Sequence, residues 1–421
     1  MYQLTVLDNG LRLVTECMPY TRSVAINYFI GTGSRYETEQ QAGISHFVEH
    51  MCFKGTDKYP TSTDVSTVIE GVGGILNAGT DKELTVYWCK VAEPHFARAL
   101  DVLTDILLHS KYEQEELEKE RQVIIEEINM SLDSPAQRVS MLIDDLMWPG
   151  QPLGRDIAGG KDSVARISRQ MMLDYMAAQY RPDNIVLSIA GAIDQESVLE
   201  AVGRATADWP GILPALDYTP FHPNKEKRRV LIEKRETEQT QLCLSMPGIS
   251  IIHPDRFNLD LLNVILGEGM SSRLFTEVRD KLGLAYSIQS YAEHFLDTGA
   301  MTISAGVDNK NIKVAVKAIL RELARLKESV PEIDLHKAKE LFKGRIMLRM
   351  EDSRSVSGWM GSQEILTGRI LTVDEVINKI EAVTAADIRQ TANEILDGDK
   401  LRMAAVGPMD PDGDWEKLLK I

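Results

Sequence analysis

The chain contains two copies of one sequence pattern, and this repeat limits its possible folds more than any other feature. The segments ISRQMMLDYMAAQYRPDNIVLSIAG (167–191) and VTAADIRQTANEILDGDKLRMAAVG (383–407) each predict a capped helix, a short polar turn and an apolar strand that ends in glycine. Ser168 and Thr384, which precede the two helices, stand 216 positions apart. Two copies at so long a period indicate a duplicated domain of ~200 residues rather than a solenoid.

The length of the chain agrees with this duplication. A chain of 421 residues, 43% of them hydrophobic, exceeds the size of one typical core. The best linker is residues 210–229, which hold four prolines followed by a run of charged residues. We therefore expect a first domain at 1–209, a linker at 210–229 and a homologous second domain at 230–421.

Within each copy, strand-like runs are separated from long helical patterns. The strand-like runs of the first copy are 11–17, 23–30, 74–79, 84–91 and 184–190. Those of the second copy are 229–235, 240–246, 286–293, 299–306 and 400–406. This order predicts an α+β fold of two tandem homologous domains, each a mostly antiparallel sheet with helices packed on one face.

Composition excludes several classes of partner. The net charge is −16 and no Lys/Arg-rich run stands out, so we expect no nucleic-acid partner. No apolar run approaches the ~20 residues needed to span a bilayer, and the N-terminus does not resemble a signal peptide, so we expect no membrane association. The four cysteines form no CxxC pair, which favours free thiols in a reducing compartment. The expected location is the cytoplasm.

The stretch SHFVEHMCFKG (45–55) concentrates metal-binding chemistry in five positions. On a helix His46, Glu49 and His50 share one face, because residues at i, i+3 and i+4 are neighbours there. Two neutral imidazoles supply half of a zinc site, and the glutamate between them is placed to take a proton from a zinc-bound water. H-x-x-E-H is the inverse of the commoner zinc-peptidase motif. The alternative is a pair of surface histidines beside a solvated glutamate.

A third ligand is predicted on the helical pattern QEELEKERQVIIEEINMSL (114–132). Glu120 and Glu127 lie nearly two full turns apart and therefore on one face. Glu126 competes with Glu127 but lies about 100° away around the helix. Apolar neighbours suggest that Glu127 is partly buried, and a buried carboxylate needs a partner such as a metal. An acidic helix that is merely solvated is the alternative.

Together these residues resemble the pitrilysin family of zinc peptidases, and the resemblance covers the whole chain. It rests on GISHFVEHMCFKGT, on EKERQVIIEEI about 70 residues later, on GGILNAGTDKELTVYW and on GMSSRLFTEVRDKLGLAYSI in the second half. The resemblance implies that His46, His50 and Glu127 are zinc ligands, one ion per chain. It also implies that Glu49 is the general base and that Glu120 supports the site from behind the metal. Other divalent metals also suit nitrogen and oxygen ligands.

The second copy lacks the metal-binding set, since LNVILGEGMSS stands where the first has HFVEHMCFKG. Its segment RDKLGLAYS carries Arg279 and Tyr286, which in the family reach the substrate carbonyl and suit an oxyanion. In the same way, Asn77 and Ala78 lie in the segment that acts in the family as an edge strand to which an extended peptide adds. An ordinary exposed arginine, a packed aromatic ring and an ordinary edge strand are the alternatives.

The resemblance thus implies a zinc-dependent metalloendopeptidase that acts on short or unfolded peptides, similar to processing peptidases. The alternative is a non-catalytic assembly subunit, because the family also contains structural members. Those members usually lose the motif, whereas His46, Glu49, His50 and Glu127 are all present here. Single-chain members of the family have four such domains around a chamber, so this two-domain chain is expected to form a homodimer in which Arg279 and Tyr286 serve the partner's zinc.

Overall fold

A computed structural model describes residues 2–209, 217–223 and 228–421, so most of the predicted linker 210–229 lies outside the described residues. The chain divides into two compact units. The first comprises 1–128, 156–219 and 348–370, and the second 129–155, 220–347 and 371–421. Neither unit is contiguous in sequence.

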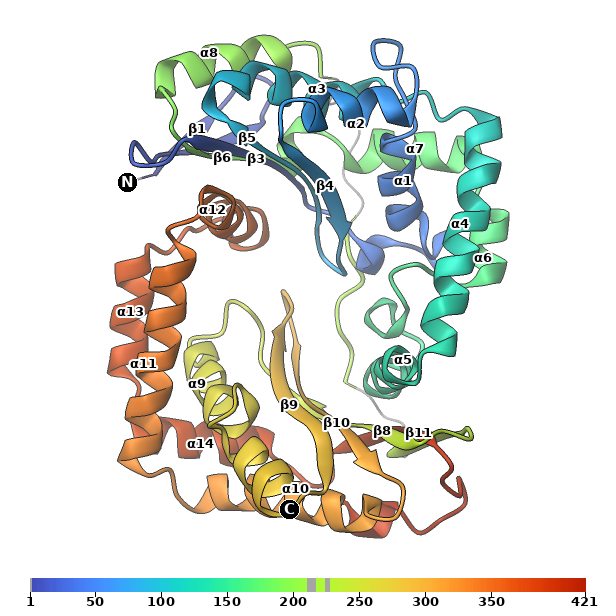
Figure 1. The fold of residues 1–421 in the computed structure, drawn as a ribbon, viewed down its shortest axis with the longest axis vertical. Coiled ribbons are helices and arrows are strands. Elements are labelled where there is room, and N and C mark those ends of the chain that lie inside the picture. The colour runs from blue at the N-terminus through green and yellow to red at the C-terminus, as the bar shows by residue number, and fades with distance from the viewer. Residues whose placement is uncertain (1, 210–216, 224–227) are drawn as a thin grey trace. The chain divides into compact units, whose positions relative to one another are not determined.

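The first unit is built on a six-stranded sheet with the order β1-β2-β6-β3-β5-β4 (Figure 1). Only β2 and β6 are parallel neighbours, and the other pairs are antiparallel. The strands are β1 (Gln3–Val6), β2 (Arg12–Cys17), β3 (Ser23–Ile30), β4 (Ile75–Thr80), β5 (Thr85–Ala92) and β6 (Ile185–Gly191). Strand β4 thus forms an edge of the sheet.

The second unit repeats this topology in a five-stranded sheet with the order β7-β11-β8-β10-β9. Its one parallel pair, β7 with β11, corresponds to β2 with β6. The strands are β7 (Val230–Lys234), β8 (Gln239–Pro247), β9 (Ala285–His294), β10 (Gly299–Asp308) and β11 (Arg402–Gly407). The shared order confirms the predicted pair of homologous, mostly antiparallel α+β domains.

Helices of the first half cover one face of the first sheet. Helix α3 packs against β5 and β3, and α1 and α2 pack against β4. The helices are α1 (Ile44–Cys52), α2 (Ser62–Glu70), α3 (Phe96–Leu108), α4 (Gln114–Asp133), α6 (Lys161–Arg166), α7 (Arg169–Gln179) and α8 (Gln195–Ala205). Helix α6 spans only six residues.

The opposite face of this sheet is covered by α12 (Ser353–Thr367), a helix from the second half of the sequence (Figure 1). Met360 packs with Phe29 in a buried cluster, and Ser357 and Ser188 exchange hydrogen bonds of 2.7 and 2.8 Å between hydroxyl and carbonyl groups. Gly361 has no room for a side chain, because a Cβ would lie 2.2 Å from the Phe29 ring. Both faces of the sheet are therefore covered, which explains why every residue of β6 is buried.

The reciprocal exchange involves α5 (Pro135–Met147), which packs against β8 and β11 of the second sheet. Val139 and Ile143 join Cys243 and Val406 in one buried cluster. The compact units therefore differ from the contiguous ranges 1–209 and 230–421 that the sequence suggested, since each half contributes one helical segment to the other unit.

The remaining helices of the second half are α9 (Arg256–Gly267), α10 (Ile312–Glu328), α11 (Glu332–Arg349), α13 (Val373–Ala382) and α14 (Ala385–Ile395). The segment Phe275–Lys281 forms a π-helix, η6. Among the described residues, no helix combines the length and apolarity that crossing a membrane requires.

Candidate metal centre

Helix α1 begins at a position that only glycine fits well. Gly43 has a left-handed φ of 93°, and a Cβ there would lie 2.4 Å from the carbonyl oxygen of Ala158. The Glu37 carboxylate accepts hydrogen bonds from the amides of Gly43 (2.8 Å) and Ser45 (2.9 Å). A carboxylate at a helix N-terminus satisfies unpaired amides and interacts favourably with the helix dipole, so it fixes where α1 starts.

The two faces of α1 have different roles. The buried residues of this helix are Ile44, Ser45, Phe47, Val48, Met51 and Cys52. His46, Glu49 and His50 occupy the remaining face and stay partly accessible. The helical period therefore puts the predicted metal-binding side chains on the face left open by the core.

Helix α4 brings two carboxylates to this face. Its inward stripe is Leu117, Glu120, Arg121, Ile124 and Ile128, and Glu120 is only 7% exposed. Arg121 holds the helix in place: its Nη2 donates to the carbonyl oxygen of Ile167 (2.8 Å), and its guanidinium lies 5.4 Å from the centre of the Phe47 ring. Glu127 lies two turns beyond Glu120 and is half-buried.

The structure brings His46, His50 and Glu127 together. One possible ligand atom from each residue lies within 4.8 Å of the other two. Nε2 of His50 is 3.1 Å from Nε2 of His46, and Oε2 of Glu127 is 3.7 Å from the first and 3.9 Å from the second. Glu126, the competing candidate, is exposed and is not part of this group.

Glu120 sets the tautomer of His50. Its Oε1 accepts a hydrogen bond of 2.8 Å from Nδ1 of His50, while its Oε2 pairs with the Lys54 ammonium. A carboxylate only accepts, so the His50 proton lies on Nδ1 and the Nε2 lone pair faces His46 and Glu127. Burial raises the pKa of Glu120, but the bonds from His50 and Lys54 outweigh it and keep that pKa below its usual value.

The charges around the two histidines favour a cation. Burial, together with the nearby His50, lowers the pKa of His46 to about 4, so this imidazole is neutral at pH 7 and free to donate a lone pair. Burial also lowers the pKa of His50, but the bond to Glu120 and the charges of Glu127, Glu120 and Glu49 outweigh it and raise that pKa. Carboxylates that draw a proton to His50 would equally attract a metal ion.

Glu49 lies on the same helix face but outside the ligand group. Its Oε2 accepts a hydrogen bond from the Thr80 hydroxyl at the end of β4. Burial raises the pKa of Glu49, and the bond from Thr80 and the charge of His50 only partly oppose this shift. A carboxyl with a raised pKa holds a proton more readily than a free one, which suits an acid–base role.

The donor set therefore fits a zinc ion. Two imidazole nitrogens and one carboxylate oxygen are typical ligands of a catalytic zinc site, which leaves a fourth position open. The hydrogen bond from His50 to Glu120 is the outer-shell contact that metal-binding histidines usually make. Among the described residues, Nδ1 of His46 is buried and has no hydrogen-bond partner, so only one of the two histidines has this support.

The predicted substrate-binding residues Asn77 and Ala78 lie on β4, the edge strand next to α1 (Figure 1). They pair with Trp88 and Tyr87 of β5. The amide of Ala78 donates a hydrogen bond of 2.8 Å to Oδ1 of Asn77. A peptide strand that added to this edge would compete with Asn77 for that amide.

Arg279 and Tyr286 lie in the second compact unit, on the π-helix η6 and on β9. The Arg279 guanidinium carbon is 4.5 Å from the centre of the Phe275 ring and 5.9 Å from that of Tyr286. Tyr286 is 75% exposed. The structure thus brings the predicted pair together and leaves the tyrosine accessible.

Three contacts of the site escaped the sequence reading: Glu37 at the start of α1, Lys54 on Glu120 and Thr80 on Glu49. Lys54 follows His50 by four residues but lies beyond the end of α1 at Cys52, so helical spacing does not mark it. Glu37 and Thr80 reach the site from separate loops or strands, and no local spacing marks them.

Comparison with known proteins gives two family matches. Residues 12–161 match the model described as Insulinase (Peptidase family M16), and residues 166–342 match the model described as Peptidase M16 inactive domain. His46, His50 and Glu127 fall within the first match, whereas Arg279 and Tyr286 fall within the second.

Two curated relatives cover almost the whole chain. An uncharacterized zinc protease of Bacillus subtilis, YmxG, is 37% identical over 95% of this chain and 97% of its own length. An uncharacterized zinc protease of Rickettsia bellii is 34% identical over 97% of this chain and 98% of its own length.

Solved structures share the fold at lower identity. A protease from Helicobacter pylori superimposes with a TM-score of 0.92 at 22% identity, over 97% of this chain and 99% of that one. A chain of Complex III2 from Candida albicans superimposes with a TM-score of 0.83 at 18% identity, over 99% of this chain and 98% of that one. Both likenesses concern the fold alone.

Proposed function

The chain belongs to the M16, or pitrilysin, family of peptidases, and from this premise we propose that it is a zinc-dependent endopeptidase that cleaves short or unfolded peptides. The observation that carries the proposal is the convergence of His46, His50 and Glu127 on one point, with Glu49 on the same helix face. These three residues would hold one zinc ion per chain.

In this proposal each side chain of the site has its own role in peptide hydrolysis. Bound zinc would polarise the scissile carbonyl and lower the pKa of a water molecule. Glu49 takes a proton from the attacking water and passes it to the leaving amine nitrogen, and its raised pKa suits both steps. Thr80 orients the Glu49 carboxylate, and Glu120 keeps the proton of His50 on Nδ1.

We further propose that the substrate binds as an extended strand along β4. An edge strand offers main-chain hydrogen bonds that demand little of the substrate sequence, which suits a peptidase acting on varied peptides. Only an extended or unfolded segment can pair in this way, because a folded substrate already uses its own main-chain groups.

The experiment combines metal analysis with a scan of quenched fluorescent peptides of varied length. We expect about one zinc per chain and cleavage that stops on chelation and returns with added zinc. Full activity in metal-free protein would refute the zinc mechanism. A chain that binds no zinc and cleaves none of the peptides would instead be a non-catalytic assembly subunit of the same fold.

We also propose a homodimer in which Arg279 and Tyr286 of one chain serve the zinc site of the other. The test mixes two inactive variants, His50→Ala and the double variant Arg279→Ala with Tyr286→Phe, and lets the subunits exchange. A mixed dimer would combine one intact metal site with one intact Arg/Tyr pair, so activity should return. Proven mixed dimers without activity would show that the pair does not act across the interface.

A further inference from the structure

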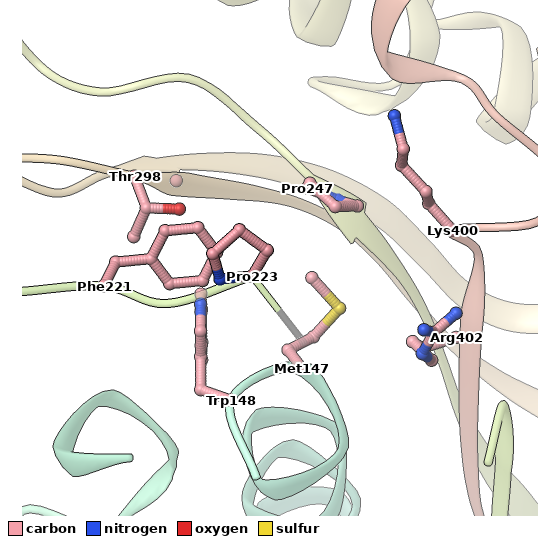
Figure 2. A pocket seen from close by; sticks show the side chains of 9 residues that line it. Met147, Trp148, Phe221, Pro223, Pro247, Thr298, Lys400 and Arg402 are labelled. Carbon is pink, nitrogen blue, oxygen red and sulfur yellow. The ribbon is translucent and has the colours of Figure 1, made fainter. Parts of the chain in front are cut away.

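A pocket of about 330 Å³ lies in the second compact unit (Figure 2). Its walls are mostly apolar, and its polar side chains come from Thr298, Lys400 and Arg402. The residues that line it are Met147, Trp148, Phe221, Pro223, Pro247, Thr298, Gly299, Lys400 and Arg402. This volume falls in the range of small-molecule sites, which also combine apolar walls with a few polar groups.

Hydrogen bonds fix the wall that Phe221 and Pro223 form. The amide of Phe221 donates to Oδ2 of Asp297 (2.7 Å). The amide of His222 donates to Oε1 of Gln151 (2.9 Å), and Nε2 of Gln151 donates back to the carbonyl oxygen of His222 (3.0 Å). This segment is therefore held at three points against the unit that contains the rest of the pocket.

The opposite walls are equally constrained. The Trp148 ring packs edge-on against Phe295 with ring centres 5.5 Å apart. The amide of Gly248, next to Pro247, donates to the carbonyl oxygen of Gly299 (2.8 Å). A Cβ at Gly299 would lie 2.4 Å from a backbone oxygen, so the strand ends approach too closely for any side chain there. The pocket is consequently a preformed feature of the fold.

Arg402 supplies a buried positive charge to this pocket. It is 9% exposed, and its Nη1 donates only to backbone carbonyl oxygens, those of Asp399 (3.1 Å) and Leu401 (3.4 Å). Within the described ranges no carboxylate lies at ion-pair distance from Arg402, and no group accepts a hydrogen bond from its Nη2 or Nε. Nε and Nη2 are not among the fully buried polar atoms without a partner, so these two donors stay accessible although most of the side chain is buried. A largely buried cation without an opposite charge favours the binding of an anion.

The groups around Arg402 add to the excess of positive charge. Burial and the neighbouring Arg229 lower the pKa of Arg402, and Glu416 only partly opposes them. Lys400 brings a further cation to the rim, although it pairs with Asp397 at 3.5 Å. In the view of Figure 2, Thr298 lies across the pocket from Arg402, and its hydroxyl is a second polar group in a mostly apolar lining.

We propose that this pocket binds a small amphipathic carboxylate, with its apolar part between Trp148, Phe221 and the two prolines and its carboxylate on Arg402. The planar guanidinium fork matches a carboxylate in shape and charge. A single buried arginine within apolar walls suits one negative charge better than a multiply charged phosphate. Such a ligand could be a free carboxylic acid or the free C-terminal residue of a peptide.

The experiment measures binding to the full chain by calorimetry, with two matched pairs of probes. Octanoate is compared with octanamide, and N-acetyl-alanyl-phenylalanine with its C-terminal amide. We expect at least one acid to bind about tenfold or more tightly than its amide, since hydrogen bonds to charged groups are the stronger ones. The pair that shows this preference identifies the source of the ligand.

Three variants distinguish binding of the probes in this pocket from binding of their carboxylate elsewhere on the chain, including to a metal ion. Arg402→Met should remove the preference for acid over amide, whereas Arg228→Met, at an exposed arginine outside the pocket, should keep it. Phe221→Trp leaves Arg402 intact and fills the cavity, so it should weaken both members of the pair. Equal binding of acid and amide, no saturable binding of either acid, a preference that survives in Arg402→Met, or unchanged binding of both probes in Phe221→Trp would overturn the proposal.

Discussion

Replacing Glu120 by Gln tests the link between the buried carboxylate and the proposed metal site. The carboxylate accepts a hydrogen bond of 2.8 Å from Nδ1 of His50 and is 7% exposed, so solvent screens it little. Glutamine has almost the same shape but no charge, and it can turn its amide group toward His50. That orientation would favour the wrong tautomer and direct the Nε2 proton toward the metal position.

The size of the effect follows from this one contact. Hydrogen bonds to charged groups contribute about 1.5–3 kcal/mol, and neutral ones about 0.5–1.5 kcal/mol. The difference of about 1–2 kcal/mol corresponds to a loss of roughly 5- to 30-fold in zinc affinity. Outer-shell partners of metal-binding histidines typically contribute about 10- to 100-fold, so this value is a lower estimate.

The assay is a zinc titration in competition with a chelating dye, followed by kcat/KM on a quenched peptide at saturating zinc. Glu118→Gln is the matched control, because Glu118 lies on the same helix but pairs with Arg121 at 3.1 Å and does not contact His50. Unchanged zinc affinity in Glu120→Gln would refute the reasoning. An equal loss in Glu118→Gln would show that the effect comes from the stability of α4 instead.

Three further predictions concern other titratable groups. Glu49→Gln should retain zinc and lose roughly 10²–10⁴ in kcat, the usual contribution of a general base, and loss of the metal in this variant would mean that its role is misassigned. Glu127→Gln should release zinc in a metal analysis whereas Glu126→Gln should not, and the reverse result would exchange the two assignments. His294 places Nδ1 2.7 Å from a backbone carbonyl oxygen and Nε2 3.1 Å from Oδ1 of Asp260, so each ring nitrogen faces a hydrogen-bond acceptor, an arrangement that favours the protonated ring. Burial lowers the pKa of His294, but the bond and charge of Asp260 outweigh it and raise that pKa. This stabilisation is complete below the unfolded pKa of about 6.5 and is lost as pH rises through the higher folded value. His294→Gln should therefore reduce the free energy of unfolding more at about pH 5.5 than at about pH 8.5 in urea titrations, and an equal loss at both would contradict the sign.

Much of the candidate site was predictable because its spacing is local. The four-residue interval from His46 to His50 and the seven-residue interval from Glu120 to Glu127 each define one face of a helix, whatever the rest of the chain does. The choice of Glu127 over Glu126 was weaker on spacing alone and relied on the family resemblance. In the structure Glu126 is exposed, and a carboxylate oxygen of Glu127 lies near the two histidines.

The contacts that complete the site were not predictable in the same way. Thr80 and Glu37 reach α1 from a strand end and a loop far from its own turns, so no periodicity relates them to it. The buried charge of Arg402 was equally hidden. Its burial depends on how β11 and the segment at 220–223 pack, and neither position carries a signal of its own.

By itself, the sequence determined the duplication, most of the strands, and the face of α1 that carries His46, Glu49 and His50. Only the tertiary structure decided which sheet each helix covers. Helix α5 belongs to the first half of the chain but packs on the second sheet, and α12 belongs to the second half but packs on the first sheet. Hydrophobic burial is non-directional. The apolar face of a helix therefore shows that the helix must pack against another element, but not which sheet it packs against. Each sheet has a second apolar face to bury, and particular contacts, such as Gly361 against Phe29 and Ser357 with Ser188, select the helix that covers it.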